Sequence, residues 1–86
     1  ASIDENEKLN LTVYPNPVSD VLIIELNETP TNTSVLILDI TGKEVYRSDY
    51  MNQNSISINM NGIDKGIYIL KVFNEEKEKS IRIVKQ

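Results

Sequence analysis

Apolar and polar residues alternate with a period of two along most of the chain, and no stretch shows a convincing helical period. The plainest case is SISINM at 55–60, where isoleucine and methionine occupy one face and serine and asparagine the other. Other short apolar runs are bounded by polar turn residues in the same way. The pattern predicts about seven strands, at 9–14, 21–26, 35–40, 45–50, 55–60, 67–73 and 80–85.

The spacing of these strands predicts the fold class. Short strands at intervals of roughly 8–12 residues are typical of an all-β, immunoglobulin-like antiparallel β-sandwich. The run IYILKVF at 67–73 is the most apolar and is expected to be a central strand, whereas DITGKEV reads as a hairpin. Tyr68, after the turn NGIDKG, resembles the tyrosine corner of such sandwiches, in which the hydroxyl bonds nearby backbone; a buried strand tyrosine without that bond is the alternative.

The segment YPNPVSD at 14–20 interrupts the strand pattern near the beginning of the chain. Proline fixes φ and lacks an amide donor, so within sheets it occurs at edges or breaks. We therefore expect Pro15 and Pro17 to end the first strand and to turn the chain into the second. They should also deny hydrogen bonds to a stray neighbouring strand.

Composition narrows the function classes. The chain has 86 residues, which supports one domain, with 13 acidic and 9 basic residues and a net charge of −4. It contains neither cysteine nor histidine, which removes disulfides, thiolate metal sites and the commonest general base. The acidic balance argues against nucleic-acid binding, and no apolar run approaches the ~20 residues of a membrane span. The expectation is a domain without catalytic residues, metal or cofactor, not an enzyme and not membrane-spanning.

Two local features remain as candidates. Asp39 lies inside an apolar strand and is expected to bond the Thr41-Gly42-Lys43 turn rather than to act in catalysis. The end of the chain, SIRIVKQ, is basic and contains no acid. As an exposed edge strand it could dock to a partner by strand pairing.

Four motifs in order, YPNPVSDVLII, DITGKEV, GIDKGIYILKV and SIRIVK, together resemble the type A C-terminal sorting domain of the type IX (Por) secretion system. The resemblance covers nearly everything from Leu9 to Gln86, and residues 1–8 look like a linker from an upstream cargo. It implies export through the periplasm to the cell surface or the medium. The implied partners are the outer-membrane translocon, a sortase-like surface peptidase and the covalently fused cargo.

The resemblance also implies site residues. Recognition by the secretion machinery is assigned to the last strand, Ser80, Ile81, Arg82, Ile83, Val84 and Lys85. The other motif positions are expected to shape the fold: Pro15, Asn16, Pro17, Gly42, Lys43, Gly66, Tyr68 and Lys71.

Two other functions stay open at this point. One is an immunoglobulin-like accessory module that binds carbohydrate or protein, for which Tyr46 and Tyr50 offer a thin aromatic platform. The other is a passive spacer within a secreted protein.

Overall fold

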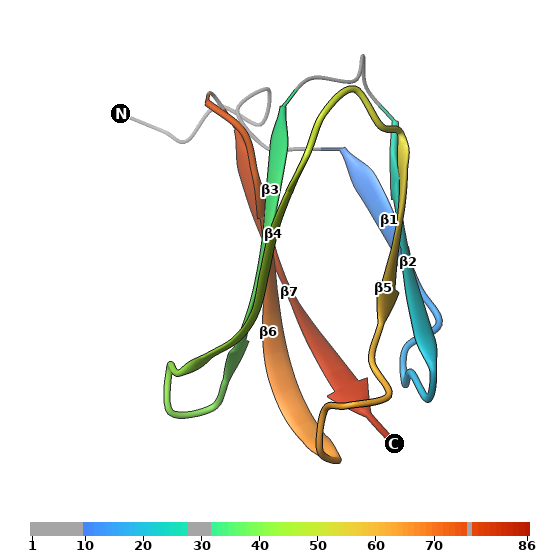
Figure 1. The fold of residues 1–86 in the computed structure, drawn as a ribbon, viewed down its shortest axis with the longest axis vertical. Coiled ribbons are helices and arrows are strands. Elements are labelled where there is room, and N and C mark those ends of the chain that lie inside the picture. The colour runs from blue at the N-terminus through green and yellow to red at the C-terminus, as the bar shows by residue number, and fades with distance from the viewer. Residues whose placement is uncertain (1–9, 28–31, 76) are drawn as a thin grey trace.

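The computed structural model describes residues 10–27, 32–75 and 77–86, which form two facing antiparallel sheets (Figure 1). The described residues contain strands and turns but no helix. The strands are β1 (Leu11–Tyr14), β2 (Val21–Leu26), β3 (Thr33–Asp39), β4 (Glu44–Tyr50), β5 (Ser55–Asn59), β6 (Gly66–Phe73) and β7 (Glu78–Lys85).

Strand order places β2, β3 and β6 in the interior of their sheets. The smaller sheet has the order β1-β2-β5 and the larger β4-β3-β6-β7, so β7 lies at an edge. The central position of β6 confirms the expectation from its apolar sequence, because the central strand buries backbone on both sides. The all-β sandwich predicted from the strand spacing is the observed architecture.

The core is made by the inward residues of both sheets. Alternate positions of β2, β5 and β6 are buried, so one face of each strand points into the space between the sheets. The fully buried side chains are Val18, Leu22, Ile24, Val35, Ile37, Ile56, Ile58, Met60, Leu70, Val72 and Ile83. Aliphatic burial of this kind supplies most of the folding free energy in a small domain, at about 25 cal/mol per Å².

The strand limits agree with the predictions at about half of the ends that can be compared, and they differ by one or two residues at the others. Both ends of β3 differ, because this strand begins at Thr33 and ends at Asp39. Ile40 was expected within that strand but belongs to the turn and is 78% exposed. The predicted start of the first strand, Leu9, lies outside the described residues.

Two predicted turn features are present. The Tyr68 hydroxyl donates to the Asp64 carbonyl at 2.7 Å, which confirms the tyrosine-corner interpretation. Asp39 Oδ1 accepts from the Thr41 amide (2.9 Å), the Thr41 hydroxyl (2.6 Å) and the Lys43 amide (3.0 Å). The Thr41 hydroxyl and the Lys43 amide lower the pKa of Asp39, because these bonds favour the carboxylate.

Candidate functional site

The last strand presents only half of its side chains to solvent. Alternate residues of β7 point inward, and Ile83 and Lys85 on that face are 0% and 9% exposed. Lys85 extends its ammonium group to the main-chain oxygen of Gln86 at 3.0 Å. Ser80, Arg82 and Val84 point outward from the larger sheet. Within the folded domain, therefore, three of the six residues predicted for recognition are available to a partner through their side chains.

The outward edge of β7 is covered along its C-terminal half by the segment around the two prolines. The Val18 amide donates to the Val84 carbonyl, and the Gln86 amide donates to the Val18 carbonyl, both at 2.8 Å. Val18 and Lys85 thus form a parallel bridge between the beginning and the end of the domain. The N-terminal half of the same edge, from Glu78 to Arg82, has no strand beside it in the described part of the chain.

Asn16 extends this contact through its side chain. Its amide nitrogen donates to the Arg82 carbonyl at 3.0 Å, and its amide oxygen accepts from the Val84 amide at 3.1 Å. One side chain therefore satisfies both edge groups, as a neighbouring strand would. The peptide bonds before Pro15 and Pro17 are both cis.

These contacts change the interpretation of the proline segment (Tyr14–Val18). The first strand does end at Tyr14, as predicted. The two prolines were expected to deny hydrogen bonds to a stray neighbouring strand; the residues beside them, Asn16 and Val18, bond the last strand of the domain itself. Sequence reasoning missed Val18 entirely. The available clue was that Pro15 and Pro17 lack a backbone N–H. In this short segment, a backbone N–H that bonds another strand must therefore come from the residue between the prolines or from one after them, such as Val18.

The two motif glycines occupy backbone conformations that favour glycine. Gly42 has φ +89° in the β3–β4 turn, and Gly66 has φ +155° where β6 begins. A side chain at either position would be strained because positive φ brings Cβ against the backbone. The Lys43 amide completes the turn by donating to Asp39. The backbone angles give a physical reason for glycine at both positions.

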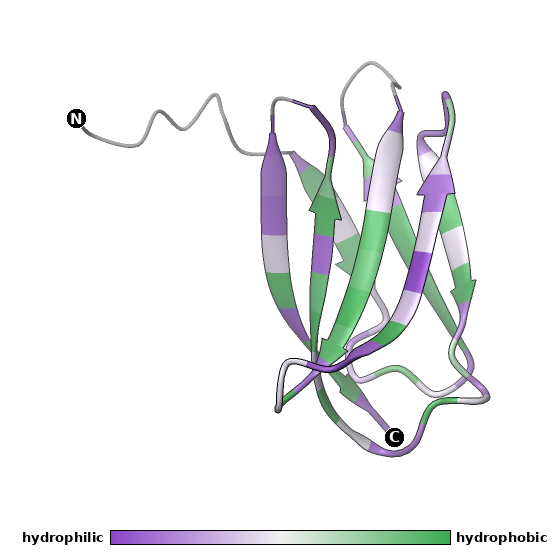
Figure 2. Ribbon diagram, turned by 60° about the vertical axis from the view of Figure 1, so that its left-hand side comes forward, coloured by the Kyte–Doolittle hydropathy of each residue, from purple (hydrophilic) through white to green (hydrophobic). Residues whose placement is uncertain are grey.

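Lys71 was grouped with the structural residues, but the structure places its side chain on the outer surface of β6. Tyr68, Leu70 and Val72 form the inner face of this strand, as predicted, so Ile67, Ile69 and Lys71 face outward. The register sets Lys71 opposite Ser80, Ile69 opposite Arg82 and Ile67 opposite Val84. We call these six residues the β6–β7 face. Figure 2 views this side of the larger sheet, where apolar colour on β3 and β6 is flanked by polar stretches of β4 and β7.

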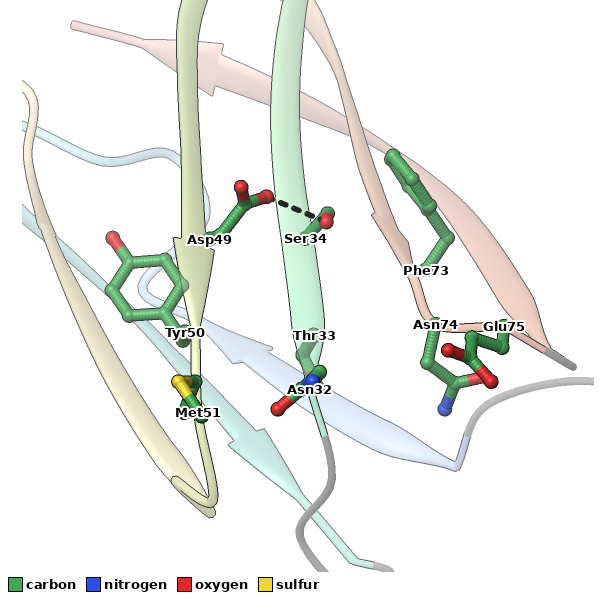
Figure 3. Close-up of a pocket in the computed structure, with 9 residues that line it drawn as sticks. All are labelled: Asn32, Thr33, Ser34, Asp49, Tyr50, Met51, Phe73, Asn74 and Glu75. Atoms are coloured by element: carbon green, nitrogen blue, oxygen red, sulfur yellow. Dashed lines mark hydrogen bonds between the residues drawn. The ribbon is translucent and has the colours of Figure 1, made fainter.

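A pocket of about 480 Å³ lies at the end of the larger sheet where β3 begins and β4 and β6 end (Figure 3). Asp49 in its wall accepts a hydrogen bond from the Ser34 hydroxyl at 2.7 Å. The lining residues come from the ends of three strands: Asn32, Thr33, Ser34, Asp49, Tyr50, Met51, Phe73, Asn74 and Glu75. None of the residues predicted for the sorting function lines it, although Tyr50 of the aromatic pair considered for carbohydrate binding does, so the pocket and the last strand are separate features.

The aromatic pair considered for carbohydrate binding faces the interior. Tyr46 and Tyr50 are half-buried on β4 and pack against the core, with their hydroxyls 2.6 Å apart. Burial raises the pKa of Tyr50, and the bond to Tyr46 adds to the effect. Stacking on a sugar needs an open ring face, which packing against the core restricts.

Residues 10–27, 32–75 and 77–86 contain neither a cluster of metal-ligating side chains nor a long apolar helix. No cluster of three or more histidine, cysteine, aspartate or glutamate side chains is placed to hold a metal ion there. No helix in this part of the chain has the length and apolar character to cross a membrane.

Comparison with protein families places the chain. Residues 12–86 match the family model described as the secretion system C-terminal sorting domain, so the chain belongs to this family, which serves type IX secretion. The match includes all four motifs and every strand except the first residue of β1. The function of the chain is therefore that of a non-catalytic secretion signal for export from the cell.

The chain also resembles parts of larger proteins. It is 33% identical over 81 residues to an endo-acting ulvan lyase of Formosa agariphila, covering 91% of the chain and 15% of that enzyme. It is 36% identical over 72 residues to an ulvan lyase of Nonlabens ulvanivorans, covering 83% of the chain and 13% of that enzyme. The chain thus spans less than a sixth of each relative, and most of each enzyme lies outside the match.

A solved structure supports the fold. The chain matches a DUF3244-family protein with an immunoglobulin-like β-sandwich from Bacteroides vulgatus, with a TM-score of 0.78 and 18% identity. The match covers 88% of the chain and 84% of that protein. The immunoglobulin-like sandwich predicted from strand spacing is confirmed.

Proposed function

We propose that the chain is the sorting domain of a longer exported protein, with residues 9–86 forming the domain and residues 1–8 linking it to an upstream cargo. The cargo crosses the inner membrane first. In the periplasm, the folded domain is then recognised by the outer-membrane translocon of the type IX system. A sortase-like surface peptidase removes the domain, and the cargo is released or attached to the cell surface.

One observation carries the site assignment within this proposal. Strand β7 lies at a sheet edge and directs Ser80, Arg82 and Val84 away from the core, so a partner can reach them without unfolding the domain. Ile81, Ile83 and Lys85 then contribute by holding the strand in place. On this assignment, the outward residues of the terminal motif serve recognition and its inward residues serve packing.

The experiment is a fusion of a periplasmic reporter to the chain in a host that carries the type IX machinery. Three forms are compared: reporter with the full chain, reporter alone, and reporter with residues 80–86 deleted. Reporter at the surface or in the medium only with the full chain supports the proposal. Equal delivery of the reporter alone, or retention of the full fusion in the periplasm, contradicts it.

A further inference from the structure

Strand β7 could bind a partner in two ways, through its backbone edge or through the outer face of the sheet. A partner could add a strand to the edge, or it could cover the outer face of the sheet. The edge is already occupied along its C-terminal half, where Asn16 and Val18 bond the backbone of Arg82, Val84 and Gln86. Strand addition there would require those bonds to break. The outer face needs no such change.

The β6–β7 face combines apolar and basic groups. Ile67 is 41% exposed, Ile69 and Val84 are half-buried, and the register places the three in cross-strand pairs that are neighbours on the outer face. The apolar area continues onto β3, because Leu38 lies opposite Ile69. Directly opposed side chains in a sheet share one surface, so these residues form a continuous patch.

Two cations lie on this patch. Lys71 and Arg82 belong to cross-strand pairs that are neighbours on the outer face, and neither makes an ion pair in the described part of the chain. By contrast, Arg47 on the same sheet is paired with Glu44 at 3.0 Å. The acid nearest in register on these strands is Glu78, which lies opposite Phe73, two pairs beyond Lys71 and Ser80. Uncompensated positive charge on a chain of net charge −4 indicates complementarity to an acidic surface.

We propose that the β6–β7 face is the docking surface of the domain for a partner protein with an apolar centre and acidic side chains at its rim. This inference rests on the proposed function, and its partner is the component of the secretion machinery that reads the folded domain. Interfaces of this kind place apolar contacts at the centre and charged groups around them. An anionic membrane is the weaker occupant, because electrostatic membrane binding uses clusters of about 4–8 basic residues.

The test uses the reporter fused to the full chain, with substitutions of two kinds on the face. Lys71→Gln with Arg82→Gln removes both charges, and Ile67→Thr removes exposed apolar surface while keeping a β-branched residue. Each has a matched control elsewhere on the domain. Lys43→Gln with Lys65→Gln removes the same charge from turns, and Val21→Thr alters a residue of similar exposure, 44%, on the other sheet.

Folding of every fusion is first verified by thermal unfolding, so that a loss of delivery reports on the surface. We expect the double substitution Lys71→Gln with Arg82→Gln to lower the amount of delivered reporter roughly tenfold. Charges at the rim of an interface speed association, so their loss weakens docking. Ile67→Thr should lower delivery in the same direction, with both controls at the unsubstituted level. Two independent kinds of variant keep the test decisive should one of them fold poorly.

The outcomes separate the inference from the proposed function. Normal delivery of both folded face variants, with the unsubstituted fusion delivered, overturns the docking surface and leaves the sorting role intact. Failure of the unsubstituted fusion itself overturns the sorting role. Binding of the fusion to phosphatidylglycerol vesicles, lost in the charge variant, overturns the protein partner in favour of a membrane surface.

Discussion

The contact between the proline segment and the last strand leads to a quantitative prediction for Asn16→Ala. This change removes two hydrogen bonds, from the Asn16 amide nitrogen to the Arg82 carbonyl and from the Val84 amide to the Asn16 amide oxygen. Each such bond contributes a net ~0.5–1.5 kcal/mol, so the pair contributes about 1–3 kcal/mol. The side chain is exposed and water can replace it, which favours the lower half of that range.

We therefore expect the free energy of unfolding to fall by about 1–2 kcal/mol, measured by urea titration with an unchanged m-value. In a domain of this size the same change lowers Tm by roughly 4–16 °C. Asn61→Ala is the control, because this residue is exposed in a turn and its main-chain amide is bonded to the side chain of Asn59, while its own side chain makes no hydrogen bond within the described residues. Changes at such surface positions usually stay within about 0.5 kcal/mol.

Hydrogen exchange makes the prediction specific to the contact. The Val84 amide points away from β6 and is bonded by Asn16, whereas the Ile83 amide points toward β6 in the sheet ladder. A loss of about 1–2 kcal/mol corresponds to exchange at Val84 faster by roughly 5–30-fold, with a smaller change at Ile83. Equal stability of the two alanine variants, or unchanged exchange at Val84, would refute the reasoning.

Three further predictions address the core, a turn and pH. Ile83→Ala should lower the free energy of unfolding, measured by urea titration, by about 2–5 kcal/mol because it leaves a cavity in the core. Val84→Ala should lower it clearly less, and equal losses would contradict the faces assigned to the two residues. Gly42→Ala should lower stability by about 1–2 kcal/mol because its φ is +89°, whereas Gly62→Ala, with open space and no positive φ, should be near neutral. Burial raises the pKa of Tyr68, so its stabilising contribution is complete below the ordinary value of 10.0 and is lost as pH rises through the higher folded value. Unfolding measured from neutral to alkaline pH should show this loss, and Tyr68→Phe should reduce it.

The sequence was sufficient for most of the fold because the relevant information is local. Alternation in SISINM fixes which side chains of β5 are buried, since neighbouring residues of a strand point to opposite faces. The central place of β6 followed from its continuous apolar run. Strand ends were less accurate, as at Thr33, because the last residue of a strand depends on its neighbour as much as on its own side chain.

The candidate site was predicted less completely. The sequence identified the terminal strand as a basic, edge-forming segment, and β7 does lie at an edge. It could not show that Lys71 shares an outer surface with Arg82, because that depends on the register between β6 and β7. The recognition role assigned to Ser80–Lys85 and the docking role of the β6–β7 face remain predictions for the export experiments.

By itself, then, the sequence determined the fold class, the inward face of most strands and the turn chemistry at Asp39. At Tyr68 it left the tyrosine corner and a buried tyrosine without that bond as alternatives, and the structure decided for the first. Each of these depends on residues close together in the chain. Only the tertiary structure decided that Asn16 and Val18 cover the edge of the last strand. Asn16 is separated by 66 residues from Arg82 and by 68 from Val84. On the β7 side, these bonds use backbone N–H and C=O groups, which do not depend on the side chains of the strand. The sequence of β7 therefore does not indicate which segment covers its edge.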